Sequence, residues 1–398
     1  MPDLVPRLTT AAATKIVLVV VDGLGGVRTD ARGSELHAAA TPNLDRLARE
    51  GSSGLHTVVA PGVTAGSGAG HLAVFGYDPL VYDLGRGALS AAGVGFALQP
   101  GDVAARVNFC TLDAAGLVTD RRAGRIPTEE NAALCARILG GLTPPDGVTV
   151  FLETEREHRA LLVLRGEGLS PHLLDTDPQV TGVAPREPTA TDPEAEPTAK
   201  ALAIILEQIR SLLAGERANF VLLRGFDTLR ELPLFPQRYG LRAQAIAVYP
   251  MYAGIARILG MDVATAPGLP GQVATLGETW AAHDFFYFHH KKADSAGEDG
   301  DFERKSAAIE EVDAAIPDIL GLRPDVVCVT GDHATPSQFG AHSWHPVPFL
   351  LWGPRVGVDG VDAFDEEAAR AGAGGSILGK DLMGLMLGAA GRLVKFGA

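Results

Sequence analysis

One short apolar run constrains the fold of this chain more than any other segment. It is VVCVT at residues 326–330, bounded by Pro324 and followed directly by Gly331, Asp332 and His333. Short runs rich in β-branched residues are typical of parallel strands buried on both faces of an α/β sheet. Such a strand leaves the residues that follow it at the carboxyl edge of the sheet, where α/β proteins gather their functional groups. Asp332 and His333 are therefore candidate metal ligands.

Two further apolar runs end in the same way. KIVLVVVDGLGG, residues 15–26, carries Asp22 at its end, and the run beginning at residue 285 leads to His289, Lys291, Asp294 and Glu298. With His342, the candidate ligands are enough for two divalent ions with mixed oxygen and nitrogen ligands, and they are Asp22, Asp294, Glu298, Asp332, His333 and His342. Paired ions of this kind are suited to phosphoryl transfer. The alternative is that the Asp22 side chain caps a helix and that Asp332 and His333 only satisfy the hydrogen bonds of a loop. Burying several polar side chains without a bound ligand would, however, cost folding free energy.

A nucleophile is available in the glycine-rich segment PGVTAGSGAGHLAVFGYDP, residues 61–79. Ser67 lies between two glycines and precedes a helical pattern. A helix N-terminus carries a partial positive charge that favours bound phosphate. The alternative is a flexible glycine loop that merely opens a helix.

The length of the chain, 398 residues, predicts two domains. Residues 1–100 and 245–398 alternate strand and helix patterns, including helices expected at 41–51 and 302–320, and we predict that they form one discontinuous core. We predict an inserted domain at 101–244. It contains strand-like runs at 148–153, 160–165 and 219–225, a Pro-rich acidic loop at 177–197 and a helix at 199–214.

The composition of the chain limits the classes of partner and the cellular location that we expect. The net charge of −14 argues against nucleic acid. No apolar run is long enough to span a membrane, and residues 1–14 do not resemble a signal peptide, so we expect a cytoplasmic protein. Cys110, Cys135 and Cys328 are widely spaced in apolar surroundings and are expected to be reduced and buried. The sequence gives no indication of an oligomeric state.

Basic residues of the middle region could bind a small anion. Arg121, Arg122 and Arg125 lie in one short loop, His158 and Arg159 precede a strand, and Arg224 ends another. Arginine can grip a carboxylate or phosphate with two parallel hydrogen bonds. The alternative for any single arginine is a solvated surface residue.

Several of these motifs occur together in a known family. TGDHATP, VVVDGLG, AGSGAGHLAVFGYDP, the HxKxxD pattern at 289–294, DRRAGRIPTEEN at 120–131 and the terminal KFGA resemble the archaeal-type cofactor-independent phosphoglycerate mutases of the alkaline phosphatase superfamily. The resemblance covers nearly the whole chain in order. It implies an α/β, alkaline phosphatase-like core with a mostly parallel sheet flanked by helices, plus an inserted smaller α/β or α+β domain that binds substrate.

The resemblance also implies a mechanism. Ser67 would take the phosphoryl group from 2- or 3-phosphoglycerate and return it to the other hydroxyl, without bisphosphoglycerate. One metal would be held by Asp22, Ser67, Asp332 and His333, and the other by Asp294, Glu298 and His342. Mn²⁺ is expected, with Mg²⁺, Co²⁺ or Zn²⁺ as alternatives. The substrate contacts implied by the resemblance are Asp120, Arg121, Arg122, Arg125, His158, Arg159, Lys291 and Arg224.

Two positions depart from the family pattern. Glu298 replaces the histidine of D-x-x-G-H and favours harder ions, and Ala253 stands where similar proteins carry a basic residue. Three alternatives therefore remain open. The chain could be a metal-dependent phosphatase or phosphonate hydrolase, a mutase for another phosphorylated substrate, or a catalytically silent metal-binding or regulatory protein.

Overall fold

The computed structural model describes residues 4–28, 32–82 and 84–397, and the chain divides into two compact units. The first unit comprises residues 1–83 and 232–398, and the second comprises residues 84–231. These borders differ from the predicted ones near residues 100 and 245. Helix α4 (Arg86–Val94) packs on strands of the second unit, while Phe235 packs against Phe75 and Phe285 of the first unit.

The first unit is built on an eight-stranded sheet of order β13-β2-β12-β11-β1-β10-β8-β9. Strand β12 runs against all the others, because its two pairings are antiparallel and the remaining pairings are parallel. The mostly parallel α/β sheet predicted from the sequence is therefore confirmed. The strands are β1 (Ile16–Val21), β2 (Ser52–Thr57), β8 (Ala243–Ile246), β9 (Asp262–Ala264), β10 (Phe285–His290), β11 (Val326–Thr330), β12 (Val347–Trp352) and β13 (Gly375–Leu378).

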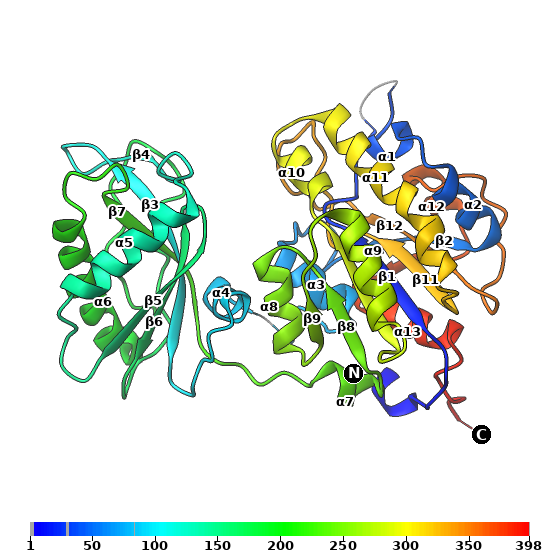
Figure 1. Ribbon diagram of the computed structural model, residues 1–398, viewed down its shortest axis with the longest axis horizontal. Coiled ribbons are helices and arrows are strands. Elements are labelled where there is room, and N and C mark those ends of the chain that lie inside the picture. Colours follow the sequence, from blue (N-terminus) through cyan, green and yellow to red (C-terminus); the bar gives the residue numbers. More distant parts are fainter. Residues whose placement is uncertain (1–3, 29–31, 83, 398) are drawn as a thin grey trace. The chain divides into compact units, whose positions relative to one another are not determined.

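Strands β1, β10 and β11 lie side by side at the centre of this sheet and are buried on both faces. Every residue of β1 and β11 is completely buried, as their apolar runs predict. One face packs against α2 (Pro42–Glu50), α9 (Gly268–Thr279) and α11 (Phe302–Gly321), and Figure 1 shows α9 and α11 lying over the sheet.

The other helices of this unit are α1 (Glu35–Ala38), α3 (Ser67–Val74), α7 (Phe235–Tyr239), α8 (Pro250–Ile258), α10 (Lys292–Glu298), α12 (Glu366–Ala371) and α13 (Leu382–Ala389), with short 3₁₀ turns at Val5–Leu8 and Gly379–Asp381. The predicted ends of α2 are confirmed, since Thr41 and Gly51 flank the helix and Pro42 begins it. The predicted apolar face of α11 is also buried, at Ile309, Val312 and Ile316.

The second unit contains a five-stranded antiparallel sheet of order β4-β3-β6-β5, in which β7 also pairs with β3. The predicted strands and the helix near 199–214 are present as β5, β6, β7 and α6, with shifted ends. Its elements are α4, β3 (Val103–Leu112), β4 (Val118–Asp120), α5 (Thr128–Gly141), β5 (Thr149–Arg156), β6 (Arg159–Arg165), a 3₁₀ turn at Pro193–Ala195, α6 (Glu196–Leu212) and β7 (Phe220–Asp227).

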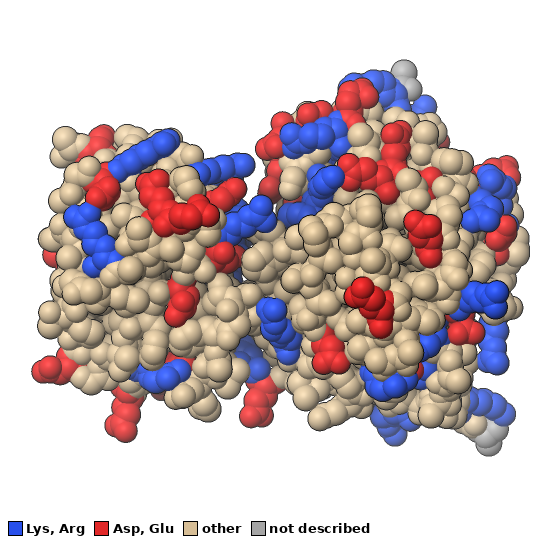
Figure 2. All heavy atoms as spheres, in the orientation of Figure 1, with Lys and Arg blue, Asp and Glu red and all other residues tan. Residues whose placement is uncertain are grey.

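Three further observations bear on the sequence-based predictions. Cys110, Cys135 and Cys328 are free and buried, as predicted. None of the described helices combines the length and apolarity that crossing a membrane would require. On the face shown in Figure 2, acidic and basic side chains are interspersed.

Candidate active site

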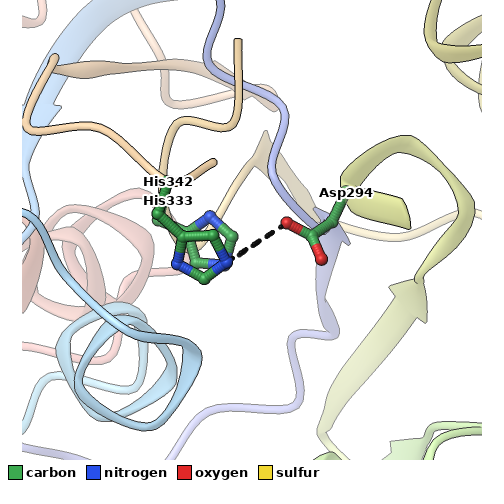
Figure 3. A group of neighbouring side chains, drawn as sticks. All are labelled: Asp294, His333 and His342. Carbon is green, nitrogen blue, oxygen red and sulfur yellow. Dashed lines mark ion pairs between the residues drawn. The ribbon is translucent and has the colours of Figure 1, made fainter. Parts of the chain in front are cut away.

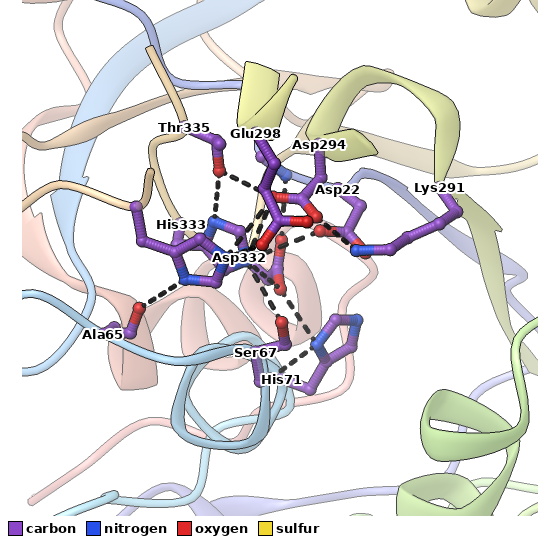
Figure 4. Close-up of polar contacts among 12 residues, drawn as sticks. Asp22, Ala65, Ser67, His71, Lys291, Asp294, Glu298, Asp332, His333 and Thr335 are labelled. Atoms are coloured by element: carbon purple, nitrogen blue, oxygen red, sulfur yellow. Dashed lines mark hydrogen bonds and ion pairs between the residues drawn. The ribbon is translucent and has the colours of Figure 1, made fainter. Parts of the chain in front are cut away.

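The candidate site lies at the carboxyl edge of the central strands. Asp22 follows β1 directly, Asp332 and His333 follow β11 after Gly331, and Asp294 lies in α10, just beyond β10. Because these three strands are parallel neighbours, residues far apart in sequence meet at one edge. Figure 4 shows their side chains converging.

The first cluster of possible metal ligands is Asp22, Asp332 and His333, all completely buried. The Nε2 atom of His333 lies 3.5 Å from Asp22 Oδ1 and 3.3 Å from Asp332 Oδ2. Among the described residues, Asp22 Oδ1 accepts no hydrogen bond, and the one nearby donor for Asp332 Oδ2 is His71 Nδ1, 3.2 Å away and already bonded to the Ser67 carbonyl oxygen. Buried polar atoms are normally satisfied, so two such oxygens facing one imidazole nitrogen fit a bound cation.

The second cluster is Asp294, His333 and His342 (Figure 3). His342 Nε2 lies 3.4 Å from Asp294 Oδ1. The imidazole rings of His333 and His342 stack with their centroids 3.7 Å apart. Glu298, predicted as the third ligand here, lies 3.9 Å from His342 Nε2, but its side chain is 55% exposed and it belongs to neither cluster. The structure thus places His333, rather than Glu298, with Asp294 and His342.

Ser67 is the first residue of α3, and its Oγ lies 3.2 Å from His333 Nε2. His71, one turn further along the helix, places its Nδ1 2.8 Å from the Ser67 carbonyl oxygen and 3.2 Å from Asp332 Oδ2. Gly70 lets this helix approach closely, because a Cβ there would lie 2.3 Å from the Asp332 carbonyl oxygen. The helix that carries the serine is therefore packed directly on the loop that carries Asp332.

Thr335 was not predicted as a site residue, yet it determines which ring nitrogen of His333 carries the hydrogen. Its hydroxyl donates to Asp294 Oδ1 at 2.7 Å and lies 3.0 Å from His333 Nδ1. A hydroxyl has one hydrogen, so the second contact requires His333 Nδ1–H to donate to it. The lone pair of His333 is then on Nε2, which faces Ser67 and the carboxylates and can bind a metal. The signal in the sequence was its place in the motif TGDHATP, two residues after His333.

Lys291 lies within the carboxylate cluster. Its Nζ is 3.2 Å from Asp22 Oδ2 and forms a short ion pair with Asp294. Burial disfavours ionised Asp22, but Lys291 and His289 outweigh it and hold the pKa of Asp22 well below its usual value. For Asp294, burial and the neighbouring Asp22 carboxylate oppose ionisation, yet His342 and Lys291 still lower its pKa. These carboxylates are therefore ionised at neutral pH.

Two histidines near this cluster were left out of the predicted site. His289, at the end of β10, places its Nε2 3.2 Å from Asp22 Oδ2, and His71 contacts Asp332. His342 is predicted correctly as a neighbour of Asp294, and although burial opposes its protonation, Asp294 raises its pKa to about 9.

The loop after β4 in the second unit is held by Asp120 at its start and by the distant Asp177. Asp120 accepts hydrogen bonds from the backbone amides of Arg122 and Gly124, at 2.8 and 2.6 Å. Arg121 forms two parallel hydrogen bonds to Asp177, at 2.9 and 2.7 Å. Asp120 and Arg121 therefore shape the loop.

A second group of arginines lies over the sheet of this unit. Arg106 on β3 pairs in register with Arg224 on β7, and Arg224 Nε lies 3.6 Å from Asp177 Oδ2. Burial, followed by the charges of Arg224 and Arg106, lowers the pKa of Arg86 to about 10. Arg86 and Arg106 were not predicted, although a charged residue inside the apolar run at 103–112 was a usable signal for Arg106.

His158 is buried beside the predicted arginines. Burial, followed by the charges of Arg159, Arg122 and Arg125, lowers its pKa to about 3. The histidine is therefore neutral at physiological pH and sits within a field of positive charge, which suits an anion.

Comparisons with known proteins agree with this geometry. Residues 48–219 match a family model described as 2,3-bisphosphoglycerate-independent phosphoglycerate mutase. A relative from Thermus thermophilus, named as a probable enzyme of that kind, is 48% identical over the full length of both chains. The chain belongs to the 2,3-bisphosphoglycerate-independent phosphoglycerate mutase family. The family and the enzyme class predicted from the sequence, an isomerase, are thereby confirmed.

A further relative and two solved structures extend the match. A Deinococcus radiodurans relative with the same name is 47% identical across all of this chain and 99% of its own. The solved cofactor-independent phosphoglycerate mutase from Thermoplasma acidophilum is 31% identical with a TM-score of 0.69, covering 95% of this chain and 100% of its own. A solved Pyrococcus horikoshii protein shares 28% identity with a TM-score of 0.82, covering 97% of this chain and 99% of its own.

Proposed function

We propose that this protein interconverts 2-phosphoglycerate and 3-phosphoglycerate through a phosphoserine at Ser67, without bisphosphoglycerate. The observation that carries the proposal is the position of the Ser67 hydroxyl at the start of α3, 3.2 Å from His333 Nε2. Asp22 and Asp332 surround the same nitrogen. The names of the relatives support this reaction. The Ser67 hydroxyl, next to the possible metal ligands, would be its nucleophile.

We propose two divalent ions at the clusters described above. Asp22, Ser67, Asp332 and His333 would hold one, and Asp294 and His342 would hold the other, with Glu298 at its exposed side. Bound there, such ions would neutralise phosphate charge and lower the pKa of the serine hydroxyl. The mixture of carboxylate and imidazole donors favours Mn²⁺, and Mg²⁺, Co²⁺ and Zn²⁺ are the ions to compare with it.

The proposed reaction consists of two successive phosphoryl transfers. Ser67 Oγ attacks phosphorus, the bond from phosphorus to the glycerate oxygen breaks, and the serine proton ends on the released hydroxyl. The other glycerate hydroxyl then attacks the phosphoserine, the bond from phosphorus to Ser67 Oγ breaks, and the proton of the attacking hydroxyl ends on Ser67 Oγ. Water would convert the same intermediate to inorganic phosphate, so a mutase must keep the glycerate bound between the two transfers.

The second unit would bind the glycerate anion. Arginines are suited to carboxylate and phosphate, and this unit concentrates them over its sheet and in the loop after β4. Arg121 pairs with Asp177, and Asp120 accepts hydrogen bonds from two backbone amides of the loop, so these two residues would shape the loop. The residues that would contact the anion are Arg86, Arg106, Arg122, Arg125, Arg159 and Arg224, with His158 beside them.

The test is Ser67→Ala, with Ser211→Ala on the exposed face of α6 as the control. The conversion of 3-phosphoglycerate to 2-phosphoglycerate is measured in a coupled assay without bisphosphoglycerate, with and without Mn²⁺. We expect Ser67→Ala to lose activity by at least about 10³-fold and Ser211→Ala to match the wild type. Peptide mass spectrometry of quenched wild type should find one phosphoryl group on Ser67.

Different results would point to the competing functions. Mutase activity in Ser67→Ala would contradict the phosphoserine mechanism. Release of inorganic phosphate without isomerised product would identify a phosphatase. Stoichiometric Mn²⁺ binding without any turnover would favour a metal-binding protein without catalytic activity.

A further inference from the structure

A buried lysine lies behind the candidate site and has no place in the proposed chemistry. Lys305 is on α11, on the same face as the buried Ile309, Val312 and Ile316, and its side chain is completely inaccessible. Burying an ammonium group is costly unless its charge is paired and its hydrogens are bonded. The groups that contact the Lys305 ammonium therefore indicate what the buried charge does in the fold.

Three oxygen atoms lie around the ammonium nitrogen of Lys305. Lys305 Nζ donates to the carbonyl oxygen of Thr335 at 2.9 Å and to that of Gly25 at 3.1 Å, and it lies 3.6 Å from Glu35 Oε2. Burial lowers the pKa of Lys305, and the charges of Glu35 and Glu366 act against that shift. The ammonium group thus joins two backbone segments and a buried carboxylate.

Glu35 extends the connection. Its Oε1 accepts a hydrogen bond from the Ser337 amide at 2.7 Å. Its Oε2 lies so close to the loop after β1 that a Cβ on Gly26 would be 2.5 Å from it. Lys305 and Glu35 together therefore contact both the 22–26 loop and the 332–337 loop.

Those two loops carry the first cluster of metal ligands. Gly25 is three residues after Asp22, and Thr335 is two residues after His333. The Thr335 hydroxyl is also the group that bonds both Asp294 and His333 Nδ1. A shift of the Thr335 backbone would consequently move the contact that sets the His333 tautomer.

We infer that Lys305 is a positioning residue, which fixes the two ligand-bearing loops against each other through the carbonyls of Gly25 and Thr335 and thereby sets the affinity for the divalent ion. The inference rests on the proposed function in that it assumes a metal at these loops. Its chemistry differs from that of a ligand, because Lys305 binds backbone oxygen and no metal.

The experiment compares Lys305→Met with Lys292→Met. Methionine keeps most of the length of the side chain and removes the charge, and Lys292 is an exposed lysine that pairs with Glu311. Mn²⁺ affinity is measured by electron paramagnetic resonance of the free ion. Loss of a group that orients metal ligands typically weakens binding by roughly 10- to 100-fold, which is the rise in Kd expected for Lys305→Met. Lys292→Met should bind as the wild type does.

A second readout reports on the loops without any metal. Hydrogen exchange at the Thr335 and Ser337 amides, which bond Gly25 and Glu35, should accelerate in metal-free Lys305→Met and not in the control. If Lys305→Met does not fold, Glu35→Gln provides the test, because glutamine can still accept from Ser337 but lacks the charge. It should also raise the Kd, by a smaller factor.

The outcomes separate this inference from the proposed function. Wild-type Mn²⁺ affinity in folded Lys305→Met, or in Glu35→Gln when the former does not fold, overturns the positioning role and leaves the proposed function intact. A wild-type protein that binds no divalent ion overturns both. Weaker Mn²⁺ binding together with faster exchange supports the inference.

Discussion

The close approach of α3 to the Asp332 loop makes Gly70→Ala a sharp test of the site. An alanine Cβ would lie 2.3 Å from the Asp332 carbonyl oxygen and 2.9 Å from its carbonyl carbon, whereas an ordinary contact needs at least 3.4 Å. Both neighbours are backbone atoms and cannot rotate away. Helix α3 and the Asp332 loop must therefore separate by roughly 1 Å.

That displacement acts on the reacting groups themselves. Ser67 is one turn before Gly70, and its hydroxyl faces His333, the residue after Asp332. A misplacement of about 1 Å at a reacting centre can cost on the order of 10²-fold in rate. Overpacking should also cost about 1–3 kcal/mol of stability, partly offset by the higher helix propensity of alanine, about 1 kcal/mol.

The assay is steady-state mutase activity with saturating Mn²⁺, together with urea unfolding. Gly140→Ala is the control, since that glycine is within α5 and a Cβ there meets nothing within 4 Å. We expect kcat to fall about 100-fold in Gly70→Ala and to stay unchanged in Gly140→Ala. A wild-type kcat in Gly70→Ala would refute the argument that this contact sets the position of Ser67.

Three further predictions concern other parts of the structure. Asp294→Ala should weaken Mn²⁺ binding more than Glu298→Ala, by at least about 10-fold in isothermal titration, because the Glu298 side chain is half exposed and outside both clusters; equal effects would restore Glu298 as a principal ligand. Arg86→Met should raise KM for phosphoglycerate by roughly 10-fold or more while the exposed Arg137→Met does not, and an unchanged KM would remove Arg86 from the anion site. Asp177→Asn should lower the unfolding free energy at pH 7 by about 1–3 kcal/mol in urea titrations, since it breaks the pair with the partly exposed Arg121. Burial opposes ionisation of Asp177, but Arg121 lowers its pKa, so its stabilisation is present above the unfolded pKa of about 3.9 and is lost as the pH falls through the lower folded value; a difference between wild type and Asp177→Asn that does not shrink as the pH falls below about 3.9 would contradict this.

The sequence predicted best where one physical rule acted alone. Asp22 and Asp332 each follow an apolar run that reads as a buried parallel strand, and parallel strands bring their carboxyl ends to one edge. The same pattern predicted the α/β class and the central strands. These inferences needed only local composition and a topological rule.

It predicted less well where the outcome depends on tertiary distances. Glu298 is four residues after Asp294, a spacing that suits one face of a helix, but α10 turns the Glu298 side chain towards solvent. Lys305 and Arg86 belong to no motif, and Thr335 belongs to one that does not reveal its contacts, so the roles of all three depend on the groups they meet across the fold. The pairing of Arg121 with Asp177, remote in sequence, likewise has no local signal.

His333 is common to both clusters of possible ligands, and its Nδ1 is engaged by Thr335, so that it has one lone pair to share. One nitrogen cannot serve two ions at once, and the ion that loses it keeps only two of its three clustered donors. The two positions should therefore be unequal in occupancy: a metal titration would fill one at low concentration and the other only at higher concentration or when substrate oxygens complete its shell. Stoichiometry measured without substrate would then report closer to one ion per chain than two.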